Sequence, residues 1–359
     1  MALERDRLRG RRGPTGRLGR SDAVPLARPL ASEPALTDSA IRRAEPVEPD
    51  GRVLSARPAK RERDHAGTLG RKKSQLVEIR ALMKKAARLN LDDPLRKGAT
   101  IELPPTGDVI FTGDLHGHKD NFTKLIEIAQ LGRYPERHII LHEATHNIQF
   151  GLFDRDISFR TIERTAEYKC EFPDQVHIVM GNHELSEYLG KKIVKDGHML
   201  NQMFAQGLKS QYGDDAGAVK QAYNIFFKSQ SLAVRCRNGI FFSHSIPSGK
   251  VMDKWDPSIL MAEGNVIEAA PIPQIEWLVW GRDYSQENVD KYAAIVGAKL
   301  VLCGHEACKK GFKVPNNRQI ILDSKDAEGV FLHIRLDREY TLEELVRNIY
   351  RINEPLPDV

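Results

Sequence analysis

The sequence lacks long apolar segments: no stretch of its 359 residues approaches the roughly 20 consecutive apolar residues that a membrane helix needs. We therefore do not expect an integral membrane protein. Cysteine is also scarce, since the chain has only four and none of them forms a C-x-x-C pair. This scarcity excludes a disulfide scaffold and favours a reducing compartment, for which we expect the cytoplasm. The N-terminus contains no apolar run, so the sequence predicts no secretory signal.

Aromatic residues are absent from the first 72 positions, where basic residues predominate. Fifteen arginines and two lysines stand there against ten acidic residues, a net charge of +7, whereas the whole chain carries +5. Proline, glycine and alanine are frequent and apolar periodicity is missing, so we predict a disordered basic tail over 1–72. Such a tail would attract acidic partners weakly. Single-strand binders interleave charge with aromatic rings, so we expect no nucleic-acid function.

The rest of the chain has the composition of a globular protein. Apolar residues make up 41% and charged residues 29% of the sequence, which is enough to build a sizeable core. Apolar residues at helical spacing predict a helix from Ser74 to Asn90, with Ser74 as its N-cap. We divide the remainder into this helix with a linker (73–100), a main domain (101–336) and a C-terminal helix and tail (337–359).

Short, wholly apolar runs recur along the main domain, and each ends abruptly in polar residues. Runs of this kind are typical of strands that are buried on both faces. Helical patterns over 121–131 and 159–168 separate some of them, and Thr341 with Glu344 predicts a capping box for a helix over 341–352. Alternating strands and helices predict an α/β domain. The predicted strands are 109–111, 139–141, 178–180, 240–242, 300–302, 320–322 and 330–334.

Residues that can bind metal follow five of these strands. Seven of the twelve histidines fall in those segments. Because loops beyond the carboxyl ends of strands form the ligand crevice of α/β sheets, we expect the five segments to meet at one polynuclear metal site. The segments are 114–118, 142–146, 182–184, 243–245 and 304–306.

The ligand types narrow the choice of metal. Imidazole, carboxylate and amide oxygen without thiolate suit zinc, iron, manganese or nickel better than a cysteine-based structural zinc. Cys303 and Cys308 flank the fifth segment, but their spacing fits no zinc-binding pattern, and we expect both to remain plain thiols.

The motifs resemble those of the calcineurin-like metallophosphoesterases, and specifically the phosphoprotein-phosphatase branch. The segments 113–117 and 181–184 match the family motifs G-D-x-H-G and G-N-H-E, and the blocks 242–247, 278–283 and 303–305 resemble the three later ones. The likeness covers about 105 to 335 in the family's order. It implies an α/β sandwich of two packed mixed sheets flanked by helices.

The second motif departs from the family. Where the family has G-D-x-x-D-R-G, this chain has His142-Glu143-Ala144-Thr145-His146-Asn147-Ile148. By the resemblance, Glu143 replaces the aspartate that bridges the metals, and His146 replaces the aspartate that orients the catalytic histidine. Asn147 replaces the arginine that grips phosphate. Arg155 or Arg160, in the loop that follows, would be candidates to restore this lost cation.

The resemblance implies two divalent cations, for which we expect manganese, with iron, zinc or nickel as alternatives. A hydroxide between them would attack phosphorus in line. One cation would be held by Asp114, His116 and Glu143. The other would be held by Glu143, Asn182, His244 and His305.

The resemblance also implies the remaining roles. His183 would protonate the leaving alkoxide without binding metal, and His146 would either orient His183 or bind solvent. Arg282, together with Asn182, would bind phosphate, although an ion pair of Arg282 with Asp283 is the simpler alternative. Glu184 and His118 are expected to support their loops, and His142 stays ambiguous.

The implied function is hydrolysis of phosphomonoesters, above all phosphoserine and phosphothreonine in proteins. The partners would then be a phosphorylated protein or a small phosphoester, without a membrane or nucleic acid. Dinucleoside polyphosphates and phosphodiesters are hydrolysed on the same scaffold, and substrate choice resides in loops. The altered second motif also leaves open a pseudophosphatase that binds metal with little turnover.

Overall fold

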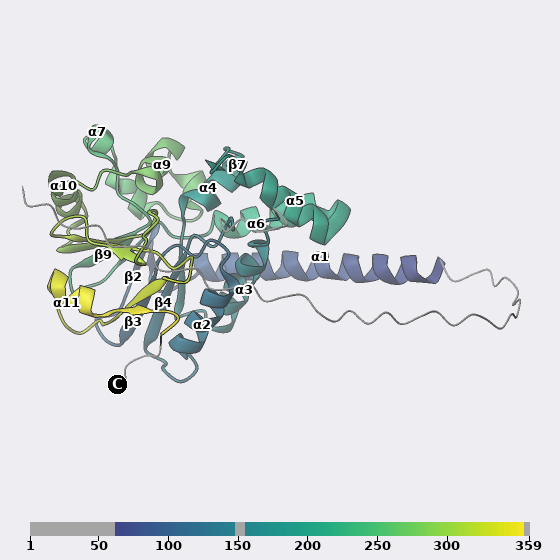
Figure 1. The fold of residues 1–359 in the computed structure, drawn as a ribbon, viewed down its shortest axis with the longest axis horizontal. Helices are drawn as coiled ribbons and strands as arrows, with labels where there is room; N and C mark the ends of the chain where they lie inside the picture. The colour runs from purple at the N-terminus through teal and green to yellow at the C-terminus, as the bar shows by residue number, and fades with distance from the viewer. Residues whose placement is uncertain (1–61, 148–154, 355–359) are drawn as a thin grey trace, which may run out of the picture. The chain divides into compact units, whose positions relative to one another are not determined.

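The computed structural model describes residues 62–147 and 155–354 (Figure 1). The predicted tail therefore lies outside the described residues as far as position 61. Helix α1 (Glu62–Leu91) begins before the predicted start, so Ser74 lies inside the helix and the predicted N-cap was wrong. Proline is absent between Pro58 and Pro94, which leaves nothing to stop the helix at Ser74.

Two mixed sheets form the centre of the fold. A smaller two-stranded sheet pairs β6 (Val194–Lys195) with β7 (His198–Met199). The seven-stranded sheet has the order β1 (Arg96–Lys97), β2 (Thr100–Glu102), β8 (Ala233–Arg235), β9 (Ile240–Ser243), β10 (Leu300–Cys303), β12 (Gln319–Leu322) and β11 (Phe312–Lys313). The five-stranded sheet has the order β14 (Ile349–Arg351), β13 (Val330–Arg335), β3 (Asp108–Thr112), β4 (Arg137–His142) and β5 (Val176–Val179). The predicted sandwich of two mixed sheets with flanking helices is confirmed.

All seven predicted strands exist, and the period of a strand explains why their sequences are apolar throughout. In β3, Val109 and Phe111 lie between the two sheets, whereas Ile110 belongs to the cluster on the outer face. Phe111 meets Phe242 of β9 across the interface, with ring centroids 5.5 Å apart. Because successive side chains point to opposite faces and both faces are covered, nearly every position in these strands is buried, and the exposed Arg335 stands at the end of β13.

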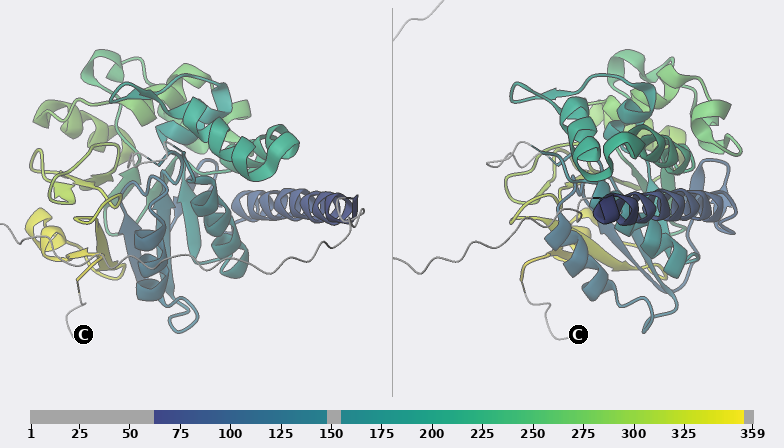
Figure 2. Two further views of the ribbon diagram at one scale, coloured as in Figure 1. Left: turned by 45° about the vertical axis from the view of Figure 1, so that its right-hand side comes forward. Right: turned by 90° about the vertical axis from the view of Figure 1, so that its right-hand side faces the viewer.

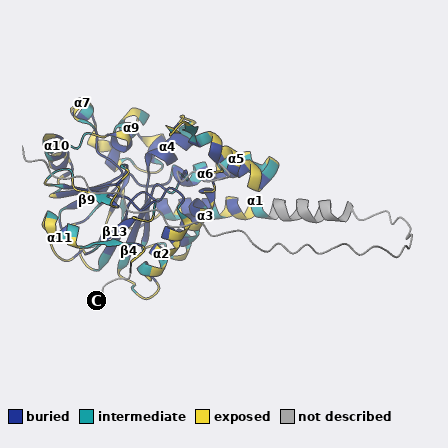
Figure 3. Ribbon diagram, in the orientation of Figure 1, coloured by how far each residue is buried: buried dark blue, intermediate teal, exposed yellow. Residues whose placement is uncertain are grey.

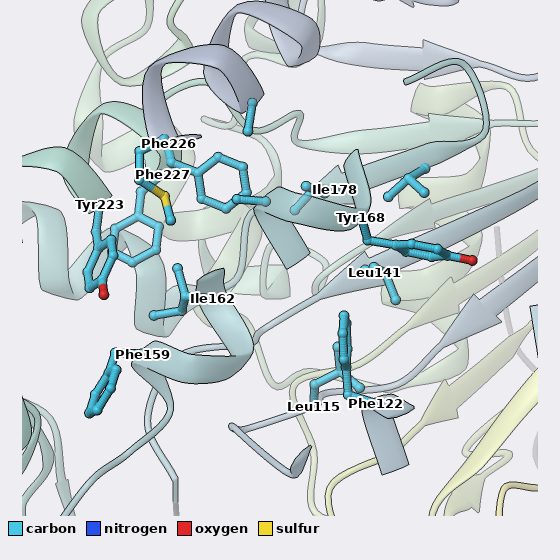
Figure 4. Packing of buried hydrophobic residues seen from close by; sticks show 14 of the residues in the cluster. Leu115, Phe122, Leu141, Phe159, Ile162, Tyr168, Ile178, Tyr223, Phe226 and Phe227 are labelled. Carbon is cyan, nitrogen blue, oxygen red and sulfur yellow. The ribbon is translucent and has the colours of Figure 1, made fainter. Parts of the chain in front are cut away.

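Helices cover the outer face of the five-stranded sheet (Figure 2). Phe122, Phe159 and Phe226 of the helices belong to one buried cluster with Leu141 and Ile178 of the strands, and Figure 4 shows these side chains. The helices that supply this cluster are α1, α2 (Lys119–Ala129), α3 (Phe159–Glu171), α5 (Leu200–Tyr212) and α6 (Ala216–Phe227).

A second group of helices covers the outer face of the seven-stranded sheet. Val301 and Ile321 of the sheet belong to one buried cluster with Leu278 and Tyr292 of these helices. Buried residues fill the sheets and the inward sides of the helices, whereas exposed residues lie on the outer sides (Figure 3). The elements on this side are α4 (Asn182–Leu189), α7 (Gly249–Met252), η2 (Pro257–Met261), α8 (Val266–Ala269), α9 (Ile272–Trp280) and α10 (Gln286–Val296); η1 (Gly213–Asp215) joins α5 to α6.

The C-terminal segment differs from its prediction. The capping box of Thr341 and Glu344 is present at the start of α11 (Leu342–Arg347), but this helix is shorter than the predicted one over 341–352. The chain then forms β14, which pairs antiparallel with β13. Pairing with a sheet edge overrides the helical pattern there, because tertiary contacts outweigh local propensity.

No helix within 62–147 and 155–354 is both long and apolar enough to cross a bilayer.

Candidate metal centre

Strand direction brings the predicted ligands together. Strands β3, β4 and β5 are parallel, so the residues after them, Asp114, Glu143 and Asn182, lie at one edge of their sheet. Strands β9 and β10 are also parallel, and they deliver His244 and His305 from the other sheet. We call these five residues, together with His116, the metal centre. It lies where the carboxyl ends of both sheets meet.

The histidines of the second sheet contact the amide of Asn182. His244 Nε2 lies 2.8 Å from Asn182 Oδ1 and 2.9 Å from Glu143 Oε2. His305 Nδ1 lies 2.9 Å from the same amide oxygen and 3.1 Å from His244 Nε2. Four donor atoms from four separate segments therefore converge on one point.

Asp114 and Glu143 stand closer to the first sheet. The backbone N–H of His305 donates to both oxygens of Asp114, at 2.9 and 3.0 Å. His116 Nε2 lies 3.8 Å from Asp114 Oδ2, and His183 Nε2 lies 3.8 Å from Glu143 Oε1. The structure thus brings together all six predicted ligands.

Two glycines of the family motifs make room for the carboxylates. A Cβ atom at Gly181 would lie 1.9 Å from Glu143 Oε2, and one at Gly304 would lie 2.1 Å from Asp114 Oδ1. Any larger residue at either position would displace a carboxylate, so the backbone itself forms part of the cradle.

The backbone at the site is strained. His116, Glu143, His146 and His305 have φ angles of 42°, 50°, 64° and 71°. This left-handed region costs a residue other than glycine about 1–3 kcal/mol and is concentrated at functional sites. The favourable free energy of folding must therefore offset the strain at these four positions, which holds their side chains in place.

Burial sets the protonation states. Burial and the neighbouring charge of Asp114 raise the pKa of Glu143 to about 8. Burial alone would also raise the pKa of Asp114, but contact with His142 and the charges of nearby imidazoles hold it well below its usual value. Burial lowers the pKa of His116 to about 3. Neutral imidazoles beside two crowded carboxylates are the arrangement that a divalent cation stabilises.

Unpaired atoms at the centre fit cations as well. Among the described residues, His244 Nδ1 and His305 Nε2 are buried without a hydrogen-bond partner, and the 2.9 Å contact of Glu143 Oε2 with His244 Nε2 lacks hydrogen-bond geometry. Buried polar atoms normally find partners, so each of these is available as a ligand. Two groups have donor atoms close enough to share an ion: Asp114 with His142 and His244, and His116 with Glu143 and His183. The donor set therefore fits two cations, and it includes His142, whose role the sequence left open.

His183 is held by a chain of hydrogen bonds that the family pattern does not contain. His183 Nδ1 and His146 Nδ1 lie 2.9 Å apart, and His146 Nε2 lies 2.9 Å from Glu187 Oε1. Glu187 also accepts from Asn201 Nδ2 at 2.6 Å and pairs with Lys220. The family's second motif has a carboxylate that orients the catalytic histidine. In this chain Glu187 supplies a carboxylate instead, and it acts on His183 through His146. Sequence reasoning missed it, although Glu187 lies four residues after His183 on α4, a spacing that places both on one helix face.

The loop arginines do not replace the lost phosphate-binding cation. Exposed Arg155 donates to Ser210 Oγ at 3.2 Å, and Arg160 lies over the ring of Phe159. Neither of them lines the cavity at the metal centre. Asn147, which stands at the family's arginine position, donates its backbone N–H to Asp156 Oδ1 at 3.1 Å.

A cavity of about 340 Å³ opens onto the metal centre. Three cationic side chains line it, namely Arg282, Lys195 of β6 and Lys325. Arg282 pairs with Glu306 and not with Asp283, so the simple ion pair considered from the sequence was wrong. No sequence motif indicates Lys195 or Lys325 as site residues. Their proximity to the metal centre depends on how the segments that contain β6 and residues 323–329 fold back toward it.

Two supporting roles agree with their predictions. Glu184 accepts hydrogen bonds from the backbone N–H and the hydroxyl of Thr145, at 2.9 and 2.6 Å, and so fixes the loop after β4. His118 caps α2 by accepting from the backbone N–H of Asn121. Cys303 and Cys308 are free thiols.

The chain belongs to the calcineurin-like phosphoesterase family, whose sequence profile matches residues 107–309. This match confirms the resemblance that the motifs indicate. Membership defines the class of the protein as a metallophosphoesterase, and the two groups of donor atoms agree with that class.

Comparison with solved structures gives matches at low sequence identity, of which the first below supports the fold. A protein serine/threonine phosphatase from Saccharomyces cerevisiae, itself similar to a human phosphatase, is 15% identical with a TM-score of 0.52, over 79% of this chain and 92% of that chain. A cold-active protein-tyrosine phosphatase from a psychrophilic Shewanella is 12% identical with a TM-score of 0.49, over 70% of this chain and 80% of that chain. No curated protein sequence matches the chain.

Proposed function

We propose that this protein is a metal-dependent phosphatase that hydrolyses phosphomonoesters, with phosphoserine and phosphothreonine in proteins as its substrates. One observation carries the proposal: four of the six proposed ligands, the buried His183 and three cationic side chains line a single cavity, and the other two ligands, Glu143 and His244, contact these four directly behind it. A centre that binds two cations beside a positively charged cavity suits a phosphate group.

The predicted ligand sets stand as part of this proposal. Asp114, His116 and Glu143 would hold one divalent cation, and Asn182, His244 and His305 would hold the other together with Glu143. Manganese is the expected metal. Cations held there supply a nucleophilic water at neutral pH and neutralise the oxygens of the phosphoryl group.

Cationic side chains would bind the phosphate. Arg282 is half-exposed at the rim and can exchange its contact with Glu306 for a bidentate contact with phosphate. Lys195 and Lys325 line the same cavity and would supply the charge that Asn147 does not. Asn182, one of the proposed metal ligands, would also donate its amide to a phosphoryl oxygen.

His183 would act as the general acid, positioned by His146. Because Glu187 accepts the proton on His146 Nε2, His146 Nδ1 is left to accept the proton on His183 Nδ1. His183 Nε2, on a residue that lines the cavity, is then unprotonated in the neutral ring and would take up the proton that the attacking water releases, giving an imidazolium held by His146; it would return this proton to the leaving alkoxide. General acids of this kind contribute about 10²–10⁴ in rate, mainly for poor leaving groups.

A second candidate substrate class is a dinucleoside polyphosphate. A pocket of about 360 Å³ adjoins the catalytic cavity, and Trp280 lines both. Trp277, Lys191 and Lys192 also line the second pocket. Aromatic faces stack on nucleobases, and lysines attract phosphates. The same pocket would equally take an apolar side chain beside a phosphorylated residue.

Substrate panels test both proposals. Hydrolysis of p-nitrophenyl phosphate with added Mn²⁺ separates an active phosphatase from a pseudophosphatase. Phosphopeptides, diadenosine tetraphosphate and a cyclic nucleotide, compared by kcat/KM, then separate the substrate classes. We expect phosphopeptides to be preferred; a preference of tenfold or more for diadenosine tetraphosphate would instead establish the second class.

The expected location in the cytoplasm remains part of the proposal. It is supported by the four cysteines, which are all free thiols.

A further inference from the structure

His142 is the last residue of β4 and lies beneath the metal centre. Its side chain is fully buried. Its ring lies edge-on to Phe242, with centroids 5.1 Å apart, and 5.4 Å from the ring of His244. The position corresponds to glycine in the family motif, so an imidazole here is a property of this chain.

Nδ1 of this ring has no polar partner within the part of the chain that the structure describes, and Nε2 has only a 2.9 Å contact with Asp114 Oδ1 that lacks hydrogen-bond geometry. An unsatisfied buried polar atom costs about 1–3 kcal/mol. An apolar residue at the same position beside Phe242 would avoid that cost. The imidazole is therefore unfavourable for folding unless something else binds it.

Its surroundings indicate what that ligand is. His142 Nε2 lies 2.9 Å from Asp114 Oδ1, and His244 Nδ1, which is unpartnered among the described residues, lies 3.9 Å from the same oxygen. The backbone is shaped around this point as well, because a Cβ atom at Gly304 would lie 2.2 Å from His142 Nε2. A carboxylate oxygen and two imidazole nitrogens without room for larger groups form a cation-binding set.

We propose that His142 is a metal ligand, which binds through Nε2 the cation that Asp114 holds. The proposal rests on the dinuclear centre of the proposed function and adds an imidazole to it. Each added imidazole favours zinc, iron or nickel over manganese, because manganese prefers oxygen ligands. This chain should therefore bind Zn²⁺ at the Asp114 position more tightly than a centre with glycine at position 142.

Metal binding tests the proposal directly. The full-length protein and the variants His142→Ala and His142→Gly are loaded with Zn²⁺, dialysed against a graded chelator and assayed for metal content. Losing an outer partner of a ligand alone costs about 10–100-fold in affinity. We therefore expect the variants to lose one Zn²⁺ per chain with at least tenfold weaker binding. His333→Ala, a variant of a half-buried histidine on β13, is the matched control.

A spectroscopic readout and a crystal structure complete the test. The visible spectrum of Co²⁺ bound at the centre should differ between the wild-type protein and His142→Ala, but not between the wild-type protein and His333→Ala. Both variants must keep a native near-ultraviolet circular dichroism spectrum. Anomalous maps of Zn²⁺-loaded crystals should place a cation about 2.0–2.1 Å from His142 Nε2. The proposal would be overturned by a map in which no cation contacts His142 Nε2 and this nitrogen keeps its contact with Asp114.

The outcomes separate this proposal from the proposed function. Unchanged Zn²⁺ affinity in His142→Ala with retained phosphatase activity would refute the ligand role and leave the phosphatase intact. Metal bound by His142 in a protein that hydrolyses no phosphoester would refute the phosphatase and leave the ligand role intact.

Discussion

Two buried clusters of histidines lie in this molecule, and they differ in whether their polar atoms are paired. In the metal centre and the adjoining His142, the atoms His244 Nδ1, His305 Nε2 and His142 Nδ1 are unpartnered among the described residues. In the second cluster, which we call the Asp93 cluster, Asp93 contacts Lys169 and His177, and His177 contacts His138. The same residue type at the same depth therefore serves two purposes.

The Asp93 cluster is complete without a ligand. Lys169 Nζ and His177 Nδ1 both lie 2.9 Å from Asp93 Oδ2, and His138 Nδ1 lies 3.1 Å from His177 Nε2. It links the segment after α1 to α3, β4 and β5. Because its groups satisfy one another, it should stabilise the fold, whereas the metal centre should destabilise the fold until cations bind. Substitutions in the two clusters should therefore have opposite consequences.

The largest effect is expected for His244→Ala in the metal centre. Losing a ligand should reduce bound metal toward one ion per chain and lower turnover of p-nitrophenyl phosphate by about 10³-fold or more, since metal ions supply several kcal/mol to the transition state. The free energy of unfolding of the metal-free protein should stay the same or rise. Metal analysis, kinetics and urea unfolding check this; unchanged metal content contradicts the assignment.

His183→Ala should separate chemistry from metal binding within the same region. Turnover should fall by about 10²–10⁴-fold on alkyl phosphates and phosphopeptides, and much less on p-nitrophenyl phosphate, whose leaving group needs no proton. Metal content should be unchanged. If the variant loses a cation instead, His183 is a ligand in the group with His116 and Glu143, and the general-acid role is wrong.

Asp93→Asn, in the Asp93 cluster, should lower the free energy of unfolding and leave turnover unchanged. Removing the carboxylate leaves Lys169 and His177 buried without their counter-charge, which typically costs about 3–5 kcal/mol of stability. Turnover measured well below the unfolding midpoint should be unchanged, because the cluster does not line the catalytic cavity. A loss of turnover without loss of stability would show that the two clusters are coupled.

Mild acid should weaken the Asp93 cluster. Burial, and then the nearby His177, lower the pKa of His138 to about 4. An unfolded histidine has a pKa of about 6.5, so between these values the unfolded chain binds the additional proton. The free energy of unfolding should therefore fall as the pH is lowered from 6.5 toward 4, by at most about 3 kcal/mol from this group. Urea titrations across this range measure the slope, which His138→Gln should reduce; an equal slope in both proteins argues against His138 as its source.

Glu187→Gln should have the smallest effect. The amide keeps the shape of the side chain but removes the charge that fixes His146. We expect kcat on alkyl phosphates to fall about tenfold, a change of about 1.4 kcal/mol in the barrier, with KM and metal content unchanged. Activity on p-nitrophenyl phosphate should change less. An equal loss on both substrates would indicate a structural role, and Glu127→Gln, an exposed residue of α2, is the control.

The sequence predicted the strands and the ligands because both depend on local patterns. Apolar runs such as 109–111 form strands that are buried on both faces. Because neighbouring strands are parallel, the polar residues that follow them meet at one edge of the sheet. The sequence did not predict β14, whose residues follow a helical pattern and pair only because β13 offers an edge. Lys195 and Glu187 were missed since their roles depend on which side chains meet in space. The extent of α1 was also missed, because its start carries no strong cap.

The order of the strands has a consequence for any attempt to isolate the catalytic region. The family match ends at 309, yet β13, which follows it, lies between β3 and β14 in the five-stranded sheet. The match begins at 107, after β2, which protects the edge of β8. A fragment trimmed to the matched residues would expose unpaired strand edges on both sheets and should aggregate. The smallest piece able to fold alone is therefore considerably longer than the homologous core.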